Sequence, residues 1–154
     1  MRNILTFIII LFTTLSYSQT LDETVDWISR NSDGKEQIFY DKYENKVLFS
    51  AVRTAGGLTS FVNEIKPNDV KSISVKYRND GWQLLSVNLK TEGVNVKSYT
   101  EDKNLELIGE KKYVRQYAIS ILIECDRSTI DKFKKAYIHF FKLLDVDVKD
   151  GDMF

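Results

Sequence analysis

The chain is poor in the residues that build covalent and metal-bound frameworks. It has one cysteine, one histidine and one proline among 154 residues, and its formal net charge is zero. One cysteine excludes an intramolecular disulfide, and one histidine excludes a metal site built on several imidazoles. The balance of 22 basic and 22 acidic residues gives no long-range attraction for nucleic acid, so we expect no nucleic-acid partner. Glycine-rich phosphate-binding motifs are missing too, and we expect no cofactor.

The longest apolar run lies at the N-terminus and has the layout of a secretory signal peptide. Arg2 precedes an apolar stretch from residue 4 to residue 15, and a cleavage motif of the small-x-small type ends at Ser18. This stretch is too short to span a bilayer as a mature helix. We therefore predict that residues 1–18 are a signal peptide, that cleavage precedes Gln19, and that no membrane span remains afterwards. The expected location is the periplasm or the extracellular space.

The remainder has the length of one domain. No linker, repeat or low-complexity segment interrupts it, and a chain of this size can bury a sufficient core without disulfides. We predict a single α+β domain over residues 19–146, followed by a flexible acidic tail over residues 147–154. The tail does not fit a calcium-binding loop, because Lys149 takes a ligand position and Gly151 comes one position late. We therefore expect no metal.

Helices are predicted at both ends of this domain. Thr20 and Glu23 can form a capping box, and the apolar stripe behind them runs to about Arg30. A similar start at Ser128 precedes a long amphipathic helix. The apolar side of that helix carries Ile130, Phe133, Ala136, Tyr137, Phe140, Leu143 and Leu144. Its lysine-rich opposite side is expected to face solvent.

Between the helices, alternating apolar and polar residues predict about seven antiparallel strands. The clearest pair is residues 72–77 and 85–89, which flank an Asp-Gly turn. The longest strand is expected from Tyr117 to Cys125, with both of these residues and three isoleucines on the core face. Residues 101–112 are predicted as a polar loop, with a short strand at Leu105 and Leu107 as the alternative.

This order of elements resembles the pleckstrin-homology-like barrel. The resemblance covers Glu36 to Leu144 and implies two roughly orthogonal antiparallel sheets, a partly open barrel or sandwich closed by the C-terminal helix. The chain also resembles small exported bacterial proteins of unknown function. They begin Thr-Leu-x-Glu-Thr and end in a Lys-Ala-aromatic helix, which correspond to residues 20–24 and 135–137 here. That second resemblance implies no activity.

Few side chains stand out as candidates for a site, and we assign no catalytic residue. Trp27, Trp82 and Ile138 are the candidates for contact with a partner, because tryptophan is enriched at binding hot spots and Ile138 falls among the polar residues of its helix. Packing over the rim of the sheet is the simpler interpretation of the tryptophans. His139 is expected in solvent, and Cys125 is expected to be a buried structural thiol.

We therefore expect an exported, non-catalytic binding or interaction module whose partner is an envelope or extracellular protein or ligand. The alternatives are a small periplasmic hydrolase that uses a carboxylate pair, and an accessory subunit of an envelope assembly. Two convergent carboxylates of perturbed pKa in a pocket would favour the hydrolase. A shallow apolar groove would favour the binding module, and a contiguous exposed apolar patch would favour the subunit.

Overall fold

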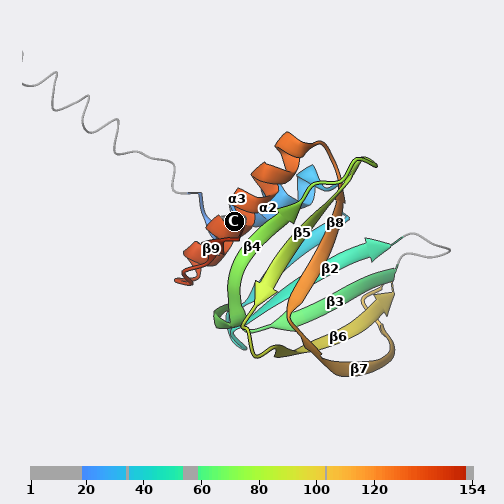
Figure 1. The fold of residues 1–154 in the computed structure, drawn as a ribbon. Coiled ribbons are helices and arrows are strands. Elements are labelled where there is room, and N and C mark those ends of the chain that lie inside the picture. The colour runs from blue at the N-terminus through green and yellow to red at the C-terminus, as the bar shows by residue number, and fades with distance from the viewer. Residues whose placement is uncertain (1–18, 34, 54–58, 103, 152–154) are drawn as a thin grey trace, which may run out of the picture.

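The computed structural model describes residues 19–33, 35–53, 59–102 and 104–151, which form an α+β fold (Figure 1). Two helices, nine strands and one short 3-10 helix are found in these ranges. The helices are α2 (Leu21–Asn31) and α3 (Arg127–Leu143), and the 3-10 helix is η1 (Pro67–Asp69). The strands are β1 (Glu36–Asp41), β2 (Lys46–Arg53), β3 (Thr59–Ile65), β4 (Val70–Lys76), β5 (Trp82–Leu89), β6 (Val94–Asp102), β7 (Leu107–Gln116), β8 (Ala118–Glu124) and β9 (Lys149–Asp150).

The strands form two sheets that are not closed into a barrel. One sheet has the order β1-β2-β3-β6-β7 and is antiparallel throughout. The other has the order β8-β5-β4-β9, and only the short β9 pairs in parallel, with β4. Because β3 pairs with β6, the β4–β5 hairpin leaves the first sheet and begins the second. The predicted α+β class is confirmed, with nine strands instead of about seven.

Both helices begin at capping side chains. Thr20 and Glu23 make the predicted capping box, with N–H to oxygen distances of 2.8 and 3.2 Å. The cap of α3 is Asp126 and not Ser128, because the Asp126 carboxylate accepts the Thr129 N–H at 2.7 Å. A negative charge is favoured at the positive end of the helix dipole, which explains why the aspartate takes the cap.

The core lies between α3 and the inner faces of the two sheets, and both helices lie on the same side of the molecule (Figure 1). The side chains of Phe133, Tyr137, Phe140 and Phe141 are all buried from solvent. Tyr137 stacks on Phe49 of β2, with ring centroids 6.3 Å apart and an interplanar angle of 6°. The predicted role of the C-terminal helix as the cover of the sheet is confirmed.

The prediction of a polar loop over residues 101–112 is wrong, because β6 and β7 form a long hairpin there. Side chains of β7 are exposed on both faces, so its sequence lacks the alternation that marks a half-buried strand. Gly109, at φ 80°, accompanies a register shift in this pair. Tyr117 is also misplaced by the prediction: it is 62% exposed, since the chain bends there between β7 and β8.

The segment predicted as a flexible tail packs on the fold as far as Gly151. Val148 is buried, and β9 pairs with the edge strand β4. The Lys134 ammonium lies 3.1 Å from the Asp150 carboxylate. The edge of β4 offers unpaired backbone groups, and residues 149–151 satisfy part of them. Residues 152–154 lie outside the described ranges.

Candidate functional site

A groove of about 940 Å³ lies between β8 and the five-stranded sheet and is called the β8 groove below. Its lining residues are 31–33, 35–36, 49–52, Phe61, Asn63, Trp82 and 119–124. Six consecutive residues of β8 thus border it. Because alternate residues of a strand point to opposite faces, a groove that borders all six runs along the edge of the strand. Its volume lies within the range of about 300–1,000 Å³ that is typical of ligand sites.

Two exposed apolar side chains are among the residues that line the β8 groove. Phe61 of β3 is 45% exposed and Leu122 of β8 is 41% exposed, so each presents a large apolar surface to solvent. Phe49 of β2 also lines the groove and is buried, and the half-buried Ala51 lies directly opposite Phe61 in the β2–β3 pair. The groove therefore combines an apolar lining with access from solvent.

The outer edge of β8 carries backbone groups that β5 does not use. Tyr117 before the strand and Cys125 after it make backbone hydrogen bonds of 2.8 and 3.1 Å to Leu89 of β5 and to the turn before β5. In an antiparallel ladder every second residue bonds to the same neighbour, so the odd-numbered residues of β8 face β5. The N–H and C=O groups of Ser120 and Leu122 then point away from β5. In the part of the chain that the structure describes, no backbone hydrogen bond joins these groups to another strand or turn.

One end of the β8 groove is polar and carries an excess of negative charge. Asp33 and Glu36 come from the turn and strand after α2, and Glu124 ends β8. Lys35 supplies the opposing charge, and its ammonium lies 3.9 Å from the Glu124 carboxylate. Three carboxylates against one ammonium make this end attractive to a basic group.

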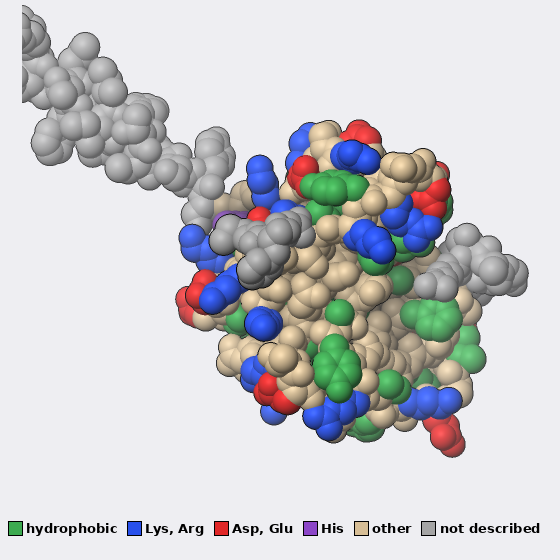
Figure 2. Space-filling view, in the orientation of Figure 1, with side chains coloured by type: hydrophobic (Ala, Val, Ile, Leu, Met, Phe, Trp, Pro, Cys, Tyr) green, Lys and Arg blue, Asp and Glu red, His purple; other side chains and the backbone are tan. Residues whose placement is uncertain are grey.

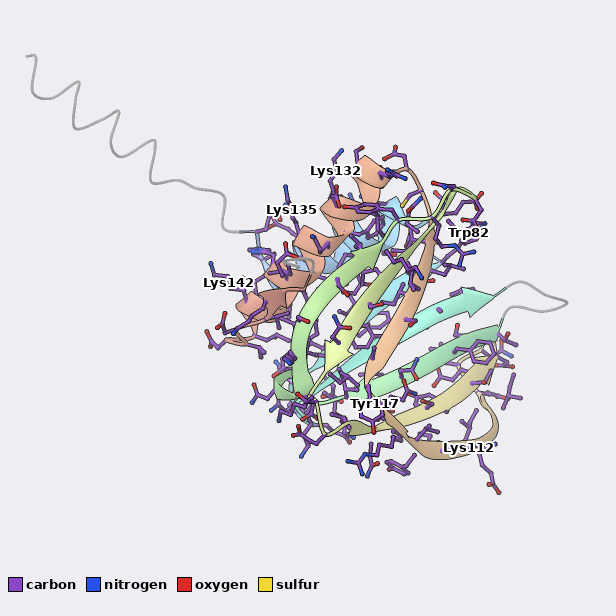
Figure 3. All side chains as sticks on the ribbon, in the orientation of Figure 1. Trp82, Lys112, Tyr117, Lys132, Lys135 and Lys142 are labelled. Atoms are coloured by element: carbon purple, nitrogen blue, oxygen red, sulfur yellow. The ribbon has the colours of Figure 1, made fainter. Side chains whose placement is uncertain are left out.

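The structure separates the three residues predicted to contact a partner. Trp82 is half-buried and lines the β8 groove, at the end of the β4–β5 hairpin (Figure 3). Trp27 packs edge-on against Phe133 of α3, with ring centroids 5.2 Å apart. Ile138 is half-buried and packs against the core, so it offers less surface than its position among polar residues indicates.

A smaller cleft of about 350 Å³ lies between α2 and α3. His139, which we expected in solvent, is half-buried there, and its Nε2 lies 3.3 Å from the Gln19 carbonyl oxygen. Lys132 and Lys135 project from the outer side of α3 beside it (Figure 3). No carboxylate or thiol is found among the described residues that line this cleft.

The groups whose pKa values depart from the ordinary ones have structural explanations. The Arg78 guanidinium lowers the pKa of Asp80, and the Thr129 backbone N–H lowers that of the Asp126 cap. Burial, with a smaller effect of Asp126, raises the pKa of the Cys125 thiol, which disfavours the reactive thiolate. Among the residues with described positions, no three His, Cys, Asp or Glu side chains gather to hold a metal ion.

Two further findings bear on partners. None of the helices within the described ranges is long and apolar enough to cross a membrane. Positive and negative side chains are interspersed over the face shown in Figure 2, with hydrophobic side chains between them.

No protein-family model, curated protein or solved structure matches this chain.

Sequence reasoning found Trp82 but missed the rest of the β8 groove. One signal was available in β8, where Leu122 stands on the polar side of the strand between Ser120 and Glu124. A large apolar residue at a solvent-facing position of a strand indicates a contact surface. Phe61 gave no comparable signal, because its exposure depends on how far the two sheets separate.

Proposed function

We propose that the protein is a non-catalytic binding module that holds an elongated ligand in the β8 groove. The observation that carries this proposal is the combination of an unused strand edge with two exposed apolar side chains, Phe61 and Leu122, among the lining residues. In terms of the pleckstrin-homology-like layout, the groove would be the open side of a partly open barrel. Ligand sites commonly combine such an apolar lining with a few polar groups.

The hydrolase alternative has less support. Glu64, Asp80 and Asp126 are carboxyl groups with a lowered pKa, and all three lie outside the β8 groove. A general acid needs the opposite change, a raised pKa in a pocket that excludes water. The accessory-subunit alternative would use the same groove as a docking surface, so the experiment below also bears on it.

The binding module can be tested by filling the groove. Ala51 lines it from β2, whereas Leu48 points to the other face of the same strand. We expect Ala51→Trp to abolish capture of envelope components by the tagged mature protein, as quantified by mass spectrometry. The matched control Leu48→Trp should capture the same components as the unchanged protein. Equal capture by both variants, at equal thermal stability, would rule out the groove as the binding surface.

We also propose that the protein is exported to the periplasm or the extracellular space. The small-x-small cleavage motif predicts a mature chain that begins at Gln19. Mass spectrometry of the protein recovered from its native cells should therefore find Gln19 at the N-terminus. Replacing Ser18 by Trp should leave residues 1–18 attached, because a bulky side chain does not suit the cleavage site. Recovery of the unchanged protein with Met1 in place would contradict export by this route.

A further inference from the structure

We propose that the ligand of the β8 groove is an extended polypeptide segment that adds to the outer edge of β8 as a further strand. This inference rests on the proposed function and names the chemistry of its ligand. The N–H and C=O groups of Ser120 and Leu122 alternate along the groove as donors and acceptors. An extended backbone supplies the complementary alternation, and strand addition to an open edge is an established mode of peptide recognition.

The other sheet edges are each interrupted or partly covered. At the start of β1, the Ser32 hydroxyl accepts a hydrogen bond of 3.2 Å from the N–H of Glu36 and donates one of 2.9 Å to its C=O. The edge of β7 is interrupted by the register shift near Gly109 and carries charged side chains. The edge of β4 is occupied by β9, which has two residues only. Proteins protect strand edges in these ways against unwanted pairing.

By contrast, β8 remains suited to pairing over its whole length. Its register with β5 is continuous from Ala118 to Glu124, without a bulge. Seven residues at a rise of about 3.3 Å give an edge of about 20 Å, the length of an ordinary strand. Leu122 places an apolar side chain near its middle, where a charged residue would discourage pairing.

The lining of the groove predicts the sequence of the segment. Side chains on one face of an added strand would point, like those of Ile119 and Ile121, toward the wall that contains Phe49 and Phe61. These positions should be apolar, and the intervening ones can be polar. The carboxylates at the polar end, Glu124 among them, favour lysine or arginine near one end of the segment. The proposed partner is thus an alternating apolar and polar segment with a basic end.

The test begins with a phage-displayed library of random decapeptides, panned against the mature protein and, for subtraction, against Ala51→Trp. We expect the enriched peptides to show the alternation and the basic end. The affinity of one synthetic peptide is then measured by fluorescence anisotropy against two variants of the same residue. Leu122→Pro removes an N–H that points away from β5, so no hydrogen bond to β5 is lost. Proline is tolerated at a strand edge whose N–H faces solvent. Leu122→Ala keeps that N–H.

We expect Leu122→Pro to weaken binding by about tenfold or more, and Leu122→Ala to weaken it by only a few fold, because the lost hydrogen bond and the blocked edge affect only the first variant. N-methylation of the peptide at alternate residues gives a test that does not depend on folding of the variant. One alternating set should abolish binding, and the other set should leave it largely intact. Such a parity effect is specific to a strand paired along one edge.

Two results would overturn strand addition. The first is equal loss of affinity, or none, from both N-methylated sets. The second is a panning experiment that enriches no peptide above the Ala51→Trp subtraction. If Ala51→Trp still abolishes envelope capture in either case, the groove remains a binding site for another class of ligand. If Ala51→Trp leaves envelope capture unchanged, the proposed function itself fails.

Discussion

Replacing Phe140 by alanine is expected to lower the free energy of unfolding by about 3–5 kcal/mol, the usual range for a buried phenylalanine. Phe140 is fully buried on the inner side of α3, and its ring meets that of Phe141 edge-on, with centroids 5.3 Å apart. The neighbouring rings belong to a rigid, sheet-covering helix, so the vacated volume cannot collapse completely. Urea denaturation gives the measurement, provided that the slope of the transition is unchanged.

Phe39→Ala is the matched control for this prediction. Phe39 lies on β1 and is largely exposed, so its removal should change the free energy of unfolding by only about 0.5 kcal/mol. A change below about 1 kcal/mol for Phe140→Ala would mean that α3 does not cover the sheet, and the two-layer architecture would have to be abandoned.

The second large effect is expected from Lys97→Met, on the opposite face of the five-stranded sheet. Lys97 Nζ lies 3.0 and 2.8 Å from the two carboxylate oxygens of Glu64, whose side chain is only 8% exposed. Loss of the ammonium leaves a nearly buried carboxylate with the Tyr99 hydroxyl and with Lys46, whose ammonium is 3.7 Å away. We expect a destabilisation of about 1–3 kcal/mol at neutral pH, the penalty for a buried polar group that loses its partner.

The destabilisation caused by Lys97→Met is expected to depend on pH. Burial by itself would raise the pKa of Glu64, but hydrogen bonds from Lys97 and Tyr99 and the nearby ammonium charges outweigh it and lower the pKa. The stabilisation from Glu64 is therefore present above the pKa of the unfolded state and is lost as the pH falls through the folded-state pKa. In Lys97→Met the pKa of Glu64 should rise. The difference in the free energy of unfolding between the variant and the unchanged protein should therefore be largest near neutrality and should shrink in acid.

Lys111→Met serves as the control, because the Lys111 ammonium lies 4.8 Å from the centre of the adjacent Tyr99 ring. This change removes a charge from the same face, with an expected effect of about 0.5 kcal/mol. If the two lysine variants have the same stability at every pH, the Lys97–Glu64 pair does not stabilise the fold.

Local sequence signals correctly predicted the elements whose capping, turn or periodicity is encoded nearby. The capping box of α2, the Asp-Gly turn before β5 and the aromatic side of α3 are examples. The same reasoning failed for β7, which is held by pairing with β6 while both of its faces remain in solvent. It also failed for the tail, because the edge of β4 that β9 joins is created by a strand far away in the sequence.

By itself, the sequence determined the α+β class, the helix at each end of the domain, and the core positions of Ile130, Phe133, Tyr137 and Phe140 on α3, since these follow from periodicity within each segment. It also limited the chemistry, because one histidine and one cysteine exclude most metal and disulfide frameworks. Only the tertiary structure decided that β3 pairs with β6, that the sheets separate beside β8, and that Phe61 and Leu122 line one groove. These features depend on contacts between segments distant in the chain, and such contacts leave no periodic signal in any one of them.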